Sequence, residues 1–217
     1  MNTLEGQPIL RALWRERLHV EPRLLESLPP HIACRFEHVW APVERLWPLL
    51  ARLPLGLLRL WLQSGKGHGV LTHQAGAYLP GPQVWRPQAG REYPFEGLCL
   101  LSVVELVEDE QRALAPLLRF LDHLLGSGAV EEGGLFSEGC GATEALQRAA
   151  ARFATLEALG YGHAALGAHT PQDYFLATLW LHATDHLRLS ALDPLLAKLY
   201  ASTLFSERFW EDAAPWG

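Results

Sequence analysis

The chain has 217 residues, 49% of them hydrophobic and 19% charged, so it can bury one large core, or one domain with a helical appendage. Its formal net charge of −6 and the lack of a lysine- and arginine-rich stripe argue against nucleic-acid binding, which requires a cationic face. The two most apolar stretches are interrupted by proline and arginine or are too short to cross a bilayer, so we expect no membrane partner.

Residues 1–65 are expected to form a helical N-terminal segment. Its first helix is predicted by apolar residues at helical spacing, namely Ile9, Leu10, Leu13, Trp14 and Leu18. A second helix is predicted to begin near Pro42, because proline suits the first turn of a helix. Between the two helices, residues 31–36 alternate weakly between apolar and polar side chains, a pattern typical of a short strand.

From residue 66 onward, glycine, proline and short apolar pairs predict turns that join strands. Three candidate strands follow, at residues 70–73, 77–79 and 83–85. We expect Pro80-Gly-Pro82 to form the turn between the last two. Residues 98–127 are mostly apolar and compatible with helix, and Pro116 should either start a helix or kink one. We expect at least two elements in this stretch.

Helices dominate the predicted C-terminal half. Residues 126–141 are rich in glycine and acidic side chains and should form a surface loop. Thr143, Thr170 and Asp193 are predicted N-caps of three helices, and a proline directly follows the last two. The pattern as a whole predicts an α+β fold that is mainly helical, with a small β-sheet.

Cysteine usage indicates a reducing compartment. Cys34, Cys99 and Cys140 are widely spaced and odd in number, which does not fit a disulfide framework. The N-terminal residues lack a basic region followed by an apolar one, so no signal peptide is predicted. We therefore expect a cytoplasmic protein.

Three segments carry a resemblance to a known family. They read Gly76-Ala-Tyr-Leu-Pro-Gly-Pro82, Phe120-Leu-Asp-His-Leu-Leu-Gly-Ser127 and Pro171-Gln-Asp-Tyr-Phe175. In this order they resemble segments of the zinc peptidases related to the anthrax lethal factor catalytic domain. The resemblance implies a zincin-like domain over residues 66–217, with residues 1–65 packed on it.

The residues that would bind zinc depart from that family. Its HExxH motif falls on Ala115, Pro116 and Arg119, where the first histidine, the glutamate and the second histidine would stand. Alanine cannot bind metal, proline cannot act as a base, and a guanidinium repels a dication. The resemblance places the third ligand at Asp173 and a phenol at Tyr161. It therefore implies a degenerate, non-catalytic domain without a cofactor, which binds a protein or a peptide.

Two alternatives stay open. His182 and His186 are four residues apart on one predicted helix, and with Asp185 they spell HxxDH, close to an inverted zinc motif. A metal-dependent hydrolase or peptidase would then bind zinc through His182, His186 and Asp173. In the simpler interpretation, both histidines are half-buried helix residues. The second alternative is a structural protein that forms homo-oligomers.

The eight tryptophans offer a further hint about surfaces. Four of them lie among leucines and are expected in the core, namely Trp14, Trp40, Trp47 and Trp61. Trp210 and Trp216 lie near the polar C-terminus. These two are the expected surface tryptophans.

Overall fold

A computed structural model of the protein describes residues 3–88, 91–127 and 133–213. The chain forms two compact units. Unit 1 comprises Met1–Ala51 and Trp61–Phe120, and unit 2 comprises Arg52–Leu60 and Leu121–Gly217. The fold is α+β and mainly helical, which confirms the predicted class. The predicted boundary between residues 65 and 66 stays a prediction.

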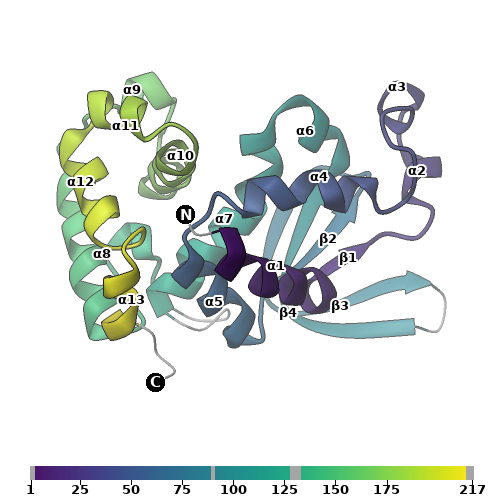
Figure 1. Cartoon of the computed structure of the whole chain (residues 1–217), viewed down its shortest axis with the longest axis horizontal. Coiled ribbons are helices and arrows are strands. Elements are labelled where there is room, and N and C mark those ends of the chain that lie inside the picture. Colours follow the sequence, from purple (N-terminus) through teal and green to yellow (C-terminus); the bar gives the residue numbers. More distant parts are fainter. Residues whose placement is uncertain (1–2, 89–90, 128–132, 214–217) are drawn as a thin grey trace. The chain divides into compact units, whose positions relative to one another are not determined.

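Unit 1 contains a four-stranded mixed sheet. Its strands are β1 (Leu18–Val20), β2 (His68–Thr72), β3 (Ala77–Gln88) and β4 (Arg91–Ser102). The strand order is β1-β2-β4-β3, with β1–β2 and β2–β4 parallel and β3–β4 antiparallel. Figure 1 shows the long β3–β4 hairpin reaching past the two shorter strands. Because β1 lies at one edge, it has a paired side and a side that no described strand pairs with.

The remaining elements of unit 1 are helices. They are α1 (Thr3–Arg17), α2 (Leu24–Ser27), α3 (Pro30–Ala33), α4 (Ala41–Leu50) and α6 (Val103–Glu108), with the end of α5 (Leu55–Ser64) and most of α7 (Glu110–Ser127). One face of the sheet is buried, and its side chains Leu18, Leu71, Cys99 and Leu101 alternate along the strands. The Cys99 thiol donates to the carbonyl oxygen of Pro116 at 3.6 Å, so α7 covers this face.

Unit 2 is helical in its described part. It contains η1 (Phe136–Glu138), α8 (Glu144–Glu157), α9 (His163–Leu166), α10 (Pro171–Thr184), α11 (His186–Leu192), α12 (Pro194–Ser202) and α13 (Glu207–Ala213). The three predicted N-caps are confirmed. The side chains of Thr143, Thr170 and Asp193 each accept a hydrogen bond from a backbone N–H three residues later.

Three local predictions were wrong. Residues 31–36 do not form a strand, because Pro30 occupies the first turn of the short helix α3. Pro80-Gly-Pro82 is not a turn: it lies within β3, where the register against β4 shifts between Leu79 and Pro82. Leu98–Ser102 belongs to β4 and not to a helix, because these residues pair with neighbours on both sides.

None of the helices within the described ranges is long and apolar enough to cross a membrane. The three cysteines are free thiols. Cys99 is fully buried, and its burial raises the pKa of its thiol far above the ordinary value.

Candidate functional site

A pocket of about 650 Å³ lies on unit 1 at the free edge of the sheet. Its lining consists of Arg11, Trp14 and Arg15 from α1, all three residues of β1, and Trp40 and Trp85. We call this site the β1 pocket. Its walls are thus three indoles, two guanidiniums and an edge strand, a combination of apolar surface and few polar groups that is typical of ligand sites.

The backbone of β1 can contribute hydrogen bonds to the β1 pocket. The Glu21 amide, just after the strand, donates to the Leu71 carbonyl oxygen at 3.0 Å. In a parallel pair, the backbone groups of successive residues point alternately toward and away from the neighbouring strand. Val20 therefore directs its N–H and C=O away from β2, toward the edge that no described strand pairs with.

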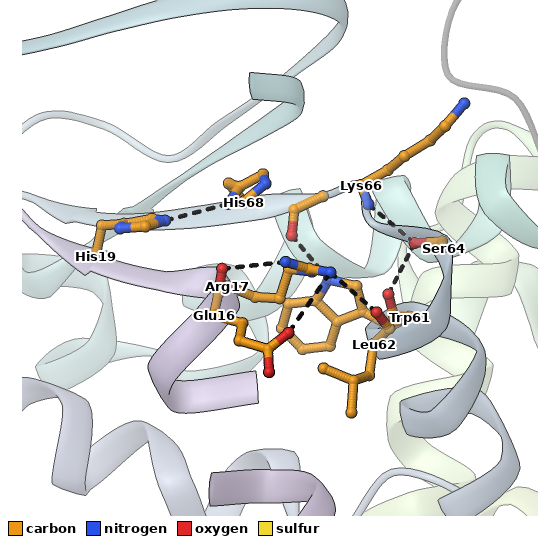
Figure 2. A network of polar contacts seen from close by, with 9 residues as sticks. Glu16, Arg17, His19, Trp61, Leu62, Ser64, Lys66 and His68 are labelled. Carbon is orange, nitrogen blue, oxygen red and sulfur yellow. Dashed lines mark hydrogen bonds and ion pairs between the residues drawn. The ribbon is translucent and has the colours of Figure 1, made fainter. Parts of the chain in front are cut away.

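Arg17 fixes the junction at which α1 becomes β1. Its Nη2 donates to the Leu62 carbonyl oxygen at 3.0 Å, and its Nη1 donates to the Glu16 carbonyl oxygen at 3.2 Å. Figure 2 shows this guanidinium below the strand that carries His68. The bond to Leu62 ties the end of α1 to the end of α5, and the bond to Glu16 lies within α1.

A tight turn positions the start of β2. The Trp61 indole N–H donates to the Gly67 carbonyl oxygen at 2.7 Å, and the Ser64 hydroxyl receives the Lys66 amide at 3.1 Å (Figure 2). Gly67 has φ +72°, and a Cβ added there would lie 2.2 Å from the Phe120 ring. Only glycine fits this turn, and the turn places His68 next to His19.

His19 and His68 form a histidine pair beside the β1 pocket. Nε2 of His19 lies 3.1 Å from Nδ1 of His68, and Figure 2 shows the rings facing each other from neighbouring strands. Both rings stack on Phe95, with centroids 4.8 and 4.0 Å away. One nitrogen must donate and the other accept, so the bond requires that the two rings are not both protonated.

Burial keeps this pair neutral. Burial, with smaller contributions from His19 and Arg17, lowers the pKa of His68 to about 4. It also lowers the pKa of His19, again with a smaller effect from Arg17. The pair is therefore an uncharged polar group at neutral pH.

Aromatic side chains extend from the histidine pair along the hairpin. Trp85 lies 5.5 Å from His19 and 5.8 Å from Tyr93 between ring centroids, and Tyr93 lies opposite Trp85 in the register. On the other wall, Trp14 packs on Trp47 with centroids 5.4 Å apart. Two of the three pocket indoles, those of Trp14 and Trp85, thus pack against neighbouring rings.

The sequence-based assignment of the tryptophans was partly wrong. Trp61 is buried as predicted, but Trp40 is 48% exposed and Trp14 is half-buried. Trp210 is 7% exposed because its ring packs against Gly56 and its N–H donates to the Leu204 carbonyl oxygen. Trp216 lies outside the described residues. Neighbouring leucines could not reveal that Trp40 precedes α4 on the surface.

The family-derived positions on α7 lie in unit 1. Ala115 is half-buried and Pro116 is buried, and the latter sits within α7 without breaking it. A Cβ added to Gly76 would lie 3.2 Å from the Pro116 ring, so this proline packs against the turn before β3. Arg119, one turn later, is half-buried. At these three positions α7 therefore carries two packing residues and one cationic side chain.

The other two family-derived positions lie in unit 2, where their backbones form structural hydrogen bonds. The Asp173 amide donates to the Thr170 hydroxyl at 3.0 Å, which forms the N-cap of α10. Tyr161 is 54% exposed, and its carbonyl oxygen lies 2.6 Å from the Tyr174 hydroxyl.

His182 and His186 do not share a helix. Helix α10 ends at Thr184, and Asp185 caps α11, which begins at His186. The His182 ring packs 4.3 Å from Phe205, and burial lowers its pKa to about 4, with a smaller effect from His186. His186 is exposed. The prediction of one continuous helix failed because Asp185 caps the second helix with its side chain.

Within the described ranges, no group of three or more histidine, cysteine, aspartate or glutamate side chains is placed to hold a metal ion. The buried carboxylates of unit 2 bond instead to protein groups. The Asp122 carboxylate accepts hydrogen bonds from the Ser137 backbone N–H and hydroxyl, each at 2.8 Å, and from the Gln172 side-chain amide at 3.2 Å. Asp193 accepts from the Leu196 amide at 2.9 Å and lies 2.8 Å from the Tyr174 hydroxyl.

Comparisons with known proteins yield no relative. No family model, no curated protein and no solved structure matches this chain. The resemblance to zinc peptidases therefore stays a prediction, and the functional argument depends on the β1 pocket.

Proposed function

We propose that the protein is a non-catalytic binding module that holds an extended segment of a protein or peptide in the β1 pocket. The observation that carries this proposal is a pocket of about 650 Å³ along the edge strand β1, whose outer side pairs with no described strand. An edge strand recognises extended peptides because its free N–H and C=O groups continue the sheet. Adjacent apolar pockets then select the side chains.

The lining of the β1 pocket suits this occupant. Trp40, Trp85 and Trp14 offer large, rigid apolar surfaces, and indoles are enriched among the residues that dominate binding energy. Trp40 is 48% exposed, an unusual position for a side chain that gains by burial. A bound segment would cover it. The degenerate HExxH positions Ala115, Pro116 and Arg119 also favour binding over hydrolysis.

The test is to pan a random-peptide library against the full chain and measure the affinity of the recovered peptides by calorimetry. We expect Trp40→Ala to weaken binding about tenfold or more, the cost of removing one central anchor. Leu187→Ala is the matched control, because Leu187 is a 69% exposed apolar residue on α11 of unit 2. Failure to recover any peptide, or equal affinities for wild type and Trp40→Ala, would contradict the proposal.

A further inference from the structure

The proposed function leaves the chemistry of the bound segment unspecified, and two guanidiniums in the β1 pocket narrow it. Arg11 and Arg15 lie four residues apart on α1, so they share one face of the helix with Trp14. Both are exposed, and neither forms an ion pair with any described residue. Two like charges at this spacing destabilise a helix slightly, and a bound anion would relieve the repulsion.

The other groups that face the β1 pocket do not neutralise these charges. Its remaining polar ring, His19, is uncharged at neutral pH because burial lowers its pKa. The neighbouring acid Glu16 does not line the pocket, and its carboxylate lies 4.0 Å from the Arg17 guanidinium. Within the described lining, the charged side chains are therefore only cationic. This local sign is opposite to the net charge of −6.

We infer that the β1 pocket recognises an acidic segment, one in which carboxylate side chains flank an aromatic or aliphatic residue. This inference rests on the proposed function. The carboxylates pair with Arg11 and Arg15, and the apolar residue lies against Trp40 and Trp85. Arginine suits this role because its planar guanidinium binds a carboxylate through two parallel hydrogen bonds.

The two-residue alternation of a strand fits this arrangement. In an extended segment paired with β1, every second side chain points to the same face. Side chains on one face would meet the guanidiniums of α1, and those on the other face would meet the indoles of Trp40 and Trp85. The segment thus needs acidic and apolar residues that alternate, a pattern that random peptides seldom contain.

The decisive experiment uses two synthetic probes of equal length. One is acetyl-Ala-Val-Glu-Trp-Glu-Val-Ala-amide, in which acidic and apolar residues alternate, and the other carries glutamine in place of both glutamates. With the full chain at neutral pH and low salt, we expect the acidic probe to bind about tenfold more tightly, and salt to reduce this preference. Arg11→Gln and Arg15→Gln should each lower the affinity for the acidic probe about threefold.

Arg152→Gln is the matched control, because Arg152 is an exposed arginine on α8 that forms no ion pair with a described residue. It should retain the full preference. Equal binding of the two probes, or an unchanged preference in Arg11→Gln and Arg15→Gln, would overturn the acidic-segment inference while the binding function stands. If neither probe binds, both this inference and the proposed binding mode are wrong.

Discussion

The two units use their polar side chains in opposite ways. In unit 2, Asp122, Tyr174 and Asp193 are buried and bond to other protein groups. In unit 1, Arg11 and Arg15 stand exposed at a pocket, and the His19–His68 pair lies half-buried beside it. Buried, satisfied polar groups specify a fold, whereas exposed ones next to an apolar pocket are available to a ligand.

Our proposal places binding in unit 1, where the family resemblance did not point. In unit 2 the resemblance directs attention to Asp173 and Tyr161, and the alternative zinc motif to His182. The structure places Asp173 in a helix cap, Tyr161 beside a buried tyrosine and His182 against an aromatic ring. The β1 pocket is formed by side chains that no sequence motif marks. Four predictions test this difference between the two units.

The largest expected effect is the loss of a buried cap in unit 2. Asp193→Ala removes the acceptor for the Leu196 amide and the partner of the Tyr174 hydroxyl, and we expect it to cost about 3 kcal/mol of unfolding free energy. Asp185→Ala is the control, since Asp185 caps α11 while exposed, and it should cost about 1 kcal/mol. Urea unfolding measures both, and equal losses would contradict the role assigned to burial.

The second effect is the pH dependence that Asp122 gives to unit 2. Burial raises its pKa to about 6, against the lowering effects of Ser137 and Gln172. Between pH 3.8 and about 6 the folded state therefore holds more protons at this site than the unfolded state, and its contribution to stability falls as pH rises. We expect a change of roughly 2 to 3 kcal/mol. In Asp122→Asn this slope should vanish, and its persistence would show that another group is responsible.

A third effect has the opposite sign and belongs to unit 1, and it is smaller because solvent screens the half-buried His68 ring. Because the pKa of His68 is lowered to about 4 from 6.5, the unfolded state binds more protons between these values. The contribution of His68 to stability is thus present above pH 6.5 and falls as pH drops toward 4. His68→Phe keeps the stacking on Phe95 and removes the titration, so its unfolding free energy should depend less on pH there. An unchanged pH dependence would refute this account of the pair.

The smallest expected effect is the change in unfolding free energy when a residue that lines the β1 pocket is replaced. Trp40→Ala should change the unfolding free energy by less than about 1 kcal/mol, because an exposed side chain contributes little burial. Trp61→Ala, by contrast, should cost about 4 kcal/mol, since Trp61 is fully buried and bonds to Gly67. Comparable losses in the two variants would mean that Trp40 is a core residue and not a ligand contact.

Features that depend on neighbouring residues, such as helix caps, are predicted well from the sequence. Features that depend on residues far apart in the chain are predicted poorly. Thr143, Thr170 and Asp193 are found as caps because an N-cap depends on residues within one turn. The strand at Leu98–Ser102 is missed, since a strand buried on both sides shows no alternation. The β1 pocket is also missed, because its lining residues are spread from Arg11 to Trp85 and only the fold brings them together.

The central claim is that the β1 pocket, and not the positions marked by the resemblance to zinc peptidases, binds the partner. The most direct measurement is the NMR spectrum of the tryptophan indole N–H groups during titration with the acidic probe. The account predicts shifts of the Trp14, Trp40 and Trp85 signals that a chelator does not alter. Shifts confined to Trp180 and Trp210 in unit 2, or binding that a chelator abolishes, would contradict it.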